Sequence, residues 1–202
     1  MSSGTAVVTE RGVLERLLAS LAQAPGSLVP TQPQWLKALR GQALERVGAL
    51  TLPTTHMEAW RFTNLSALSR QSFQPLRTTT ALQAGDIGHL HIEEATTRLV
   101  FVDGVHAPQL SSINARAGLV VGPLSSAVKT HAAVIEQHLG QHAAFQDALF
   151  PALNTAFLHD AAMLIVPPGT ALAHRCMCSL FQRRVMSPAT RAFFWWLARA
   201  AH

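Results

Sequence analysis

Residues 97–110, TRLVFVDGVHAPQL, decide which fold the chain is expected to take. A β-rich run from Leu99 to Val102 is followed by Asp103-Gly104 and then by Val105. An Asp-Gly pair flanked by apolar residues is a strong short-range signal for a β-hairpin, because both positions tolerate a positive φ angle. The stretch therefore predicts a strand, a tight turn and a returning strand.

Helical patterns precede this hairpin. Residues 8–24 place apolar side chains near one face at helical spacing, with Thr9 in the N-cap position. Residues 33–50 show the same spacing, and Pro33 suits the first turn of a helix. The apolar stripe of this second helix is expected to consist of Trp35, Leu36, Leu39, Leu44 and Val47. Residues 70–97 are polar and irregular, which predicts a loop or linker.

Short strands and further helices follow the hairpin. Residues 117–124 and 161–173 predict strands, and Pro167-Pro168-Gly169 ends the second strand. Helical patterns cover residues 125–139 and 145–159. Helices followed by short strands with helical insertions predict an α+β fold.

The positive charge of the chain comes from its last residues. The chain holds 16 Lys and Arg against 11 Asp and Glu, and residues 174–202 contain five arginines and no acidic residue. The preceding 173 residues therefore carry 11 charges of each sign and are neutral overall. A nucleic-acid-binding face would be spread over the fold, whereas this excess begins at one point, so no nucleic acid partner is expected.

The sequence favours a cytoplasmic, soluble protein that does not enter a membrane. Apolar residues make up 49% of the chain, enough for a sizeable core. Its longest uncharged apolar runs fall short of the roughly 20 residues that a membrane helix needs. Glu10 and Arg11 lie where a secretory leader would be apolar.

Cysteines and histidines offer weak metal-site patterns. Cys176 and Cys178 form a C-x-C, but a four-ligand site needs two more ligands and no C-x-x-C lies nearby. His138 and His142 are four residues apart on an expected helix, with His131 one heptad before His138, and such pairs can bind zinc. Because no H-E-x-x-H glutamate lies between them, solvated surface histidines are the favoured interpretation. No bound metal or other cofactor is therefore expected on this chain.

Two further groups of residues receive a structural interpretation. His89 and His91 alternate on a possible strand edge and are discounted as ligands for the same reason. Glu58 and Arg61 flank Trp60 and could form a carboxylate–guanidinium site, but a pair that braces a buried tryptophan is favoured. Phosphate, dinucleotide and acyl-nucleophile motifs (G-x-x-x-x-G-K-[ST], G-x-G-x-x-G and G-x-S-x-G) are absent from the sequence.

Residues 52–68, LPTTHMEAWRFTNLSAL, resemble the N-terminal pattern L-P-T-x-x-x-E-x-W-R-[YF]-T-[DN]-L of the SufB/SufD family of iron–sulfur cluster assembly proteins. Residues 99–113 resemble the first strand pair of that family, and residues 152–172 resemble the helix and strand that lead into its β-helix. The resemblance covers about residues 30–173, in the family's order. The short region before the β-helix favours the SufD branch over SufB.

The resemblance implies a fold and a function. The fold is a helical region at residues 1–75, then at 76–173 the start of a right-handed parallel β-helix with helical insertions, which here would be truncated. The function is that of a non-enzymatic scaffold that pairs with a SufB-like subunit and a SufC-like ATPase, and the iron–sulfur cluster belongs to the full complex. The family's cluster-related residues and its SufC-binding region lie beyond this stretch. No ligand residue is therefore carried over, and Glu58, Trp60 and Arg61 keep a structural role.

Residues 174–202 do not continue the family pattern, which would run on after Ala173 with a text such as QPIHLLF. If one base is restored after the Ala173 codon, several codons are forced: Met177 read with Cys176 gives Tyr or His, and Cys178 read with Met177 gives Val. The restored frame can then be read with two strand-like runs, VHVLFV and RVFLV. The segment is therefore expected to be a non-native, frameshifted tail on a SufD-like fragment.

Two alternatives remain open for the tail. Its arginines and aromatic residues suit a binding module for a membrane surface or single-stranded nucleic acid, although Pro188 interrupts a long helix. A metal-binding enzyme that uses Cys176, Cys178 and histidines is the other alternative.

Overall fold

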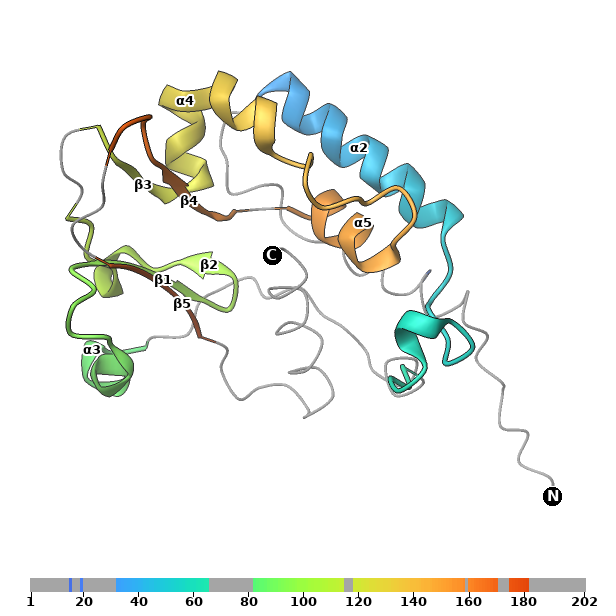
Figure 1. Ribbon diagram of the computed structural model, residues 1–202, viewed down its shortest axis with the longest axis horizontal. Coiled ribbons are helices and arrows are strands. Elements are labelled where there is room, and N and C mark those ends of the chain that lie inside the picture. Colours follow the sequence, from blue (N-terminus) through green and yellow to red (C-terminus); the bar gives the residue numbers. More distant parts are fainter. Residues whose placement is uncertain are drawn as a thin grey trace.

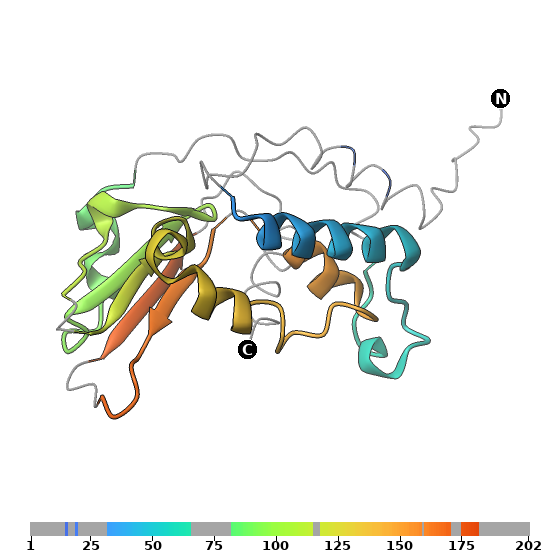
Figure 2. The same ribbon diagram turned by 90° about the horizontal axis from the view of Figure 1, so that it is seen from above.

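The structure is a computed structural model that describes residues 32–65, 82–114, 118–158, 160–170 and 175–181, together with Glu15 and Ala19. Helices α2 (Gln34–Ala49), α4 (Leu124–His138) and α5 (Leu149–Ala156) lie on one side of the molecule, and two small sheets lie on the other (Figure 1). The view from above shows the two sheets beside each other, with the helices extending away from them (Figure 2).

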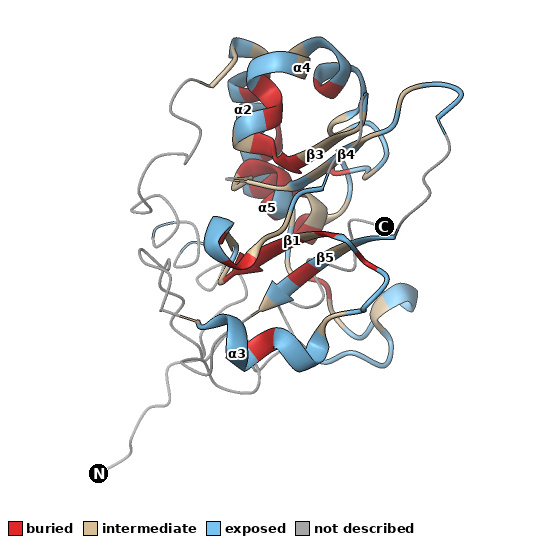
Figure 3. Cartoon of the chain, turned by 90° about the vertical axis from the view of Figure 1, so that its left-hand side faces the viewer, coloured by how far each residue is buried: buried red, intermediate tan, exposed pale blue. Residues whose placement is uncertain are grey.

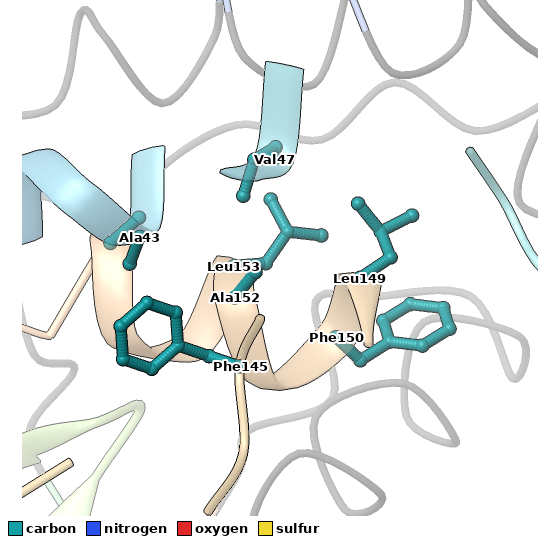
Figure 4. Close-up of a cluster of buried hydrophobic side chains, with 8 residues drawn as sticks. Ala43, Val47, Phe145, Leu149, Phe150, Ala152 and Leu153 are labelled. Carbon is teal, nitrogen blue, oxygen red and sulfur yellow. The ribbon is translucent and has the colours of Figure 1, made fainter. Parts of the chain in front are cut away.

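Helices α2 and α5 form the largest buried cluster, although about a hundred residues separate them in the chain. Ala43 and Val47 of α2 face Leu149, Ala152 and Leu153 of α5, and Phe145 and Phe150 close the two ends (Figure 4). Positions 36, 43 and 47 of α2 are buried because they share one face at helical spacing. Burial of this apolar face is what stabilises a helix of this length.

Two arginines of α2 hydrogen-bond to α5 and to the segment before it. The Arg40 Nε donates a hydrogen bond of 3.0 Å to the carbonyl of Ala156, the last residue of α5. This bond satisfies a carbonyl at a helix end, where no intrahelical donor is available. Partial burial of the guanidinium lowers the pKa of Arg40. The Arg46 Nε bonds the Gln146 carbonyl at 2.7 Å, which fixes the segment before α5.

Strand β1 (Thr97–Val102) is the centre of the first sheet, whose order is β2-β1-β5. It pairs in antiparallel fashion with β2 (Val105–His106) through the contacts of Phe101 with His106 and of Val102 with Val105. Asp103 and Gly104 take φ angles of 53° and 82°, which is the geometry of a tight hairpin turn. The predicted hairpin is confirmed.

Strand β5 (Cys176–Phe181) lies parallel to β1 on its other edge, in register from Thr97 opposite Cys176 to Val102 opposite Phe181. Ser179 and Phe181 face the same core as Val100 and Val102, and burial is concentrated on β1 (Figure 3). Residues 176–181 of the expected tail thus take part in a sheet. Residues 182–202 lie outside the described residues.

The second sheet joins β3 (Val120–Pro123) to β4 (Ala162–Ile165) in antiparallel fashion, and α4 covers one face of it. Asp160 fixes this arrangement, since its carboxylate accepts hydrogen bonds from the backbone N–H and the hydroxyl of Ser125 at 3.2 and 3.1 Å. The side chain thereby satisfies an orphan N–H in the first turn of α4, where the helix dipole also favours a negative charge.

Several expectations from the sequence need correction. Leu44, expected in the buried stripe of α2, is 47% exposed, and Ala43 takes the buried position beside it. Part of the expected linker is helical, at α3 (Ala84–Ile87) and η3 (Gly88–Leu90), because Gln83 and Asp86 form a capping box.

Helix α5 begins at Leu149 rather than at 145. Of the helix predicted over 8–24, only Glu15 and Ala19 are described, and both are helical; Thr9 lies outside the described residues.

The expected division into residues 1–75, 76–173 and 174–202 stays a prediction. Among the described residues, α2 packs on α5 and β5 pairs with β1. Helices and two small sheets agree loosely with an α+β class. The truncated β-helix stays a prediction, since the described strands contain a single parallel pair.

Two leucines of α2 test the assignment of its buried face. Leu36 is 1% exposed and Leu44 is 47% exposed. We expect Leu36→Ala to lower the free energy of unfolding by about 2–5 kcal/mol, because it leaves a cavity. The matched Leu44→Ala should change it by no more than about 0.5 kcal/mol. Urea unfolding followed by circular dichroism measures both, and equal losses would contradict the assignment.

Candidate functional site

The stretch that carries the family-like motif packs against the α2–α5 core. Pro53 is buried after α2, and the short helix η1 (Glu58–Trp60) directs Trp60 toward that core. The rings of Trp60 and Phe150 lie 5.3 Å apart between centroids, with 38° between their planes. The motif thus joins the segment after α2 to α5 through one aromatic contact.

Leu52 and Leu65 are partly buried against the same core, whereas residues 55–59 and 61–64 of the motif face solvent. Glu58 and Arg61 form an ion pair of 3.4 Å, and their side chains are 87% and 59% exposed. Such a pair stabilises a fold weakly, so Trp60, rather than the ion pair, is the structural element. Phe62 is 88% exposed, and the Arg61 guanidinium lies 4.7 Å from its ring centroid. Arginine and aromatic residues are enriched at the centres of protein–protein interfaces, so this exposed pair resembles a protein contact surface.

The two cysteines lie on the exposed face of β5. Cys176 and Cys178 alternate with Met177 and Ser179, so both project from the side of the strand opposite the core of Val100 and Val102. Local burial raises the pKa of the Cys178 thiol, which disfavours the thiolate that a metal would bind. Within the ranges that the structure describes, no three His, Cys, Asp or Glu side chains gather as they would around a metal ion.

The histidines divide into separate groups. His138 and His142 come together, with ring centroids 6.3 Å apart and planes 12° apart. His131 instead contacts the Thr130 hydroxyl at 2.8 Å, at a position where the backbone of α4 departs from helical angles. His89 lies in η3 and His91 follows it, so the expectation of a strand edge at these two residues is wrong.

A serine–histidine contact near the hairpin was not expected from the sequence. The Ser111 hydroxyl lies 3.2 Å from His106 Nε2, donates to the Ala107 carbonyl at 2.9 Å and accepts from the Val100 N–H at 3.0 Å. Desolvation lowers the pKa of His106, and the charge of Asp160 acts weakly in the opposite sense. Because its proton is committed to a backbone carbonyl, Ser111 braces the hairpin rather than serving as a nucleophile.

The alternative that the tail binds a membrane or nucleic acid stays untested, because the tail's tryptophans and all but one of its arginines lie outside the described residues. Among the residues that are described, no helix has both the length and the hydropathy to cross a bilayer. Arg175, the remaining arginine, pairs with Glu94 at 3.7 Å on the surface.

Most of the chain matches a known protein family. Residues 16–176 match the family described as the SufBD protein N-terminal region. An iron–sulfur cluster assembly SufBD family protein of Synechocystis sp. is 29% identical over 144 residues, which are 70% of this chain and 31% of that protein. The chain thus spans about a third of the length of this curated relative. The family match includes α2, the motif, the hairpin and β4, and it ends at the first residue of β5.

Trp60 and Phe62 test which half of the motif supports the fold. We expect Trp60→Ala to lower the free energy of unfolding by about 1–3 kcal/mol, because the contact with Phe150 is lost. Phe62→Ala should leave stability within about 0.5 kcal/mol of the parent chain. Thermal and urea unfolding measure the difference, and a larger loss in the Phe62 variant would reverse these roles.

Proposed function

The chain belongs to the SufBD family, and we propose that it is the N-terminal part of a SufD-like scaffold subunit for iron–sulfur cluster assembly. The match over residues 16–176 carries the proposal, and the similar Synechocystis protein is itself named for cluster assembly. The choice of SufD over SufB rests on the short region before the β-helix.

In this proposal the subunit is not an enzyme and works in the cytoplasm. It pairs with a SufB-like subunit and a SufC-like ATPase in a SufBCD-type complex, on which the cluster is assembled. The cluster ligands and the ATPase-binding region lie in the portion of the family that follows this stretch. The exposed pair of Arg61 and Phe62 supplies a surface through which the N-terminal region could contact a partner subunit.

We further propose that β1 and β5 begin a parallel β-helix. Their in-register parallel pairing, with β3 and β4 on the intervening chain, resembles one turn of a solenoid. Strand β5 is the edge of its sheet, so its outer backbone groups are free, among the described strands, to pair with a following strand. A next turn that stacks there would continue the solenoid.

Ser179 supports the proposal that residues 174–202 are read in a shifted frame. Its side chain is 7% exposed, and within the described structure its hydroxyl has no hydrogen-bond partner. A buried polar group without a partner costs about 1–3 kcal/mol. In the restored frame, the last base of the Cys178 codon and the first two of a TCN codon for Ser179 give Leu or Phe. Either side chain would suit the core around Val100 and Val102.

A substitution at this position tests the fit of β5. We expect Ser179→Val to raise the free energy of unfolding by about 1 kcal/mol, because it removes the unpartnered hydroxyl and suits a strand. Cys176→Val, on the exposed face of the same strand, should change it by less than about 0.5 kcal/mol. Urea unfolding of both variants gives the comparison. A loss of stability in the Ser179 variant would show that the serine is accommodated.

Restoring the frame tests the function. One base is added after the Ala173 codon, and both forms of the chain are produced together with a SufB-like and a SufC-like subunit. We expect the restored chain to open a long frame and to purify in a stable complex that holds an iron–sulfur cluster, and the present chain not to do so. A stop codon close after Ala173 would refute the frameshift. A long frame without complex formation would refute the scaffold function.

A further inference from the structure

The end of α4 is a tight turn that brings two imidazoles together. His138 is the last residue of the helix, and the Gln141 N–H bonds its carbonyl at 3.2 Å. Gly140 between them takes a φ of 78°, in the left-handed region that allows a helix to end and the chain to reverse. The reversal places His142 beside His138, with the ring centroids 6.3 Å apart.

Packing against α2 holds this turn in place. The φ angle of Gly140 favours glycine, and a Cβ atom there would lie 2.9 Å from Leu39 Cδ1, so a side chain at this position would displace the end of Leu39. The spacing of the two histidines is therefore set by a backbone turn seated on a packed helix. Both side chains are exposed, so their rings are free to rotate toward a shared ligand.

The separation of the rings suits a shared metal ion. Metal–nitrogen bonds of imidazole are about 2.0–2.1 Å long, so two rings on one ion have centres about 4.5 Å apart when the bonds meet at a right angle and about 6.5 Å apart when they are opposite. The observed 6.3 Å therefore suits two imidazoles on nearly opposite sides of one ion. A cation at this position is also favoured by the partial negative charge of the C-terminal end of α4.

We propose that His138 and His142 form a two-histidine site for a transition-metal dication that prefers imidazole and a tetragonal arrangement of ligands, such as Cu²⁺ or Ni²⁺. No third protein ligand gathers with them among the residues that the structure describes, so water completes the coordination. Such a site is open and exchanges its metal readily. The proposal does not rest on the SufD-like function, because its two residues come from the end of α4 and from the turn that follows it.

Copper titration of the full chain tests the site. The protein is prepared without a histidine tag and with Cys176→Ser and Cys178→Ser, so that neither a tag nor the thiols bind the metal. Titration with Cu²⁺ alone, followed by calorimetry and electron paramagnetic resonance, should show one site with two nitrogen ligands. His138→Gln and His142→Gln should each weaken binding at least about tenfold. His56→Gln, an exposed histidine elsewhere in the chain, should leave it unchanged.

A fourth variant keeps both ligands and alters only their placement. Gly140→Ala opposes the positive φ and meets Leu39, so it should weaken Cu²⁺ binding while the nitrogen ligands remain in the chain. Circular dichroism confirms that each variant is folded. The proposal is overturned if the His138 and His142 variants bind as tightly as the parent, if the spectrum shows a single nitrogen ligand, or if His56→Gln causes the larger loss.

Discussion

The position of β1 at the centre of its sheet is the constraint on which the rest of the structure depends. β1 is paired on both edges, and five of its six residues are buried. Side chains from both of its faces are excluded from water, as in strands that are covered on both sides. The hairpin that follows, the capped turn at residues 84–90 and the parallel strand β5 all pack against it. Loss of β1 would leave each of these elements without a partner.

The helices depend on a second long-range contact, in which backbone and side chains act together. The apolar faces of α2 and α5 supply the burial, and Arg40 fixes their relative position through the final carbonyl of α5. Because α5 has only eight residues, it would not be stable alone. Its helical structure therefore depends more on its packing against α2 than on its own sequence. Trp60 adds the family motif to the same core through Phe150.

Local chemistry explains which elements could be predicted from the sequence. The hairpin follows from Asp103-Gly104, and α2 follows from its apolar period after Pro33. The helical turn at residues 84–87 had a readable signal in Gln83 and Asp86, which the polar composition of the segment concealed. The pairing of β1 with β5 had none, because a parallel pair joins residues far apart and no turn sequence marks it.

In the candidate sites, too, the sequence shows which residues are present, but their approach depends on contacts between distant parts of the chain. The spacing of His138 and His142 is visible in the sequence, but their approach depends on a left-handed Gly140 and on Leu39 of another helix. The contact of Ser111 with His106 likewise arises only once the hairpin has formed. Exposure of Phe62 could not be inferred, since an aromatic residue beside Trp60 suggests a core position.

In β5 the backbone fits the sheet well, but the side chains fit the core less well. The ladder with β1 uses only N–H and C=O groups, so a segment without proline can add to that edge whatever its sequence. The side chains fit less well, because Leu180 is 61% exposed while Ser179 is buried with an unpartnered hydroxyl. In a strand shaped by its core, the apolar residue would take the inner position. β1 therefore acts as the template for β5, and the side chains of β5 are matched to that core less well than its backbone is matched to the sheet.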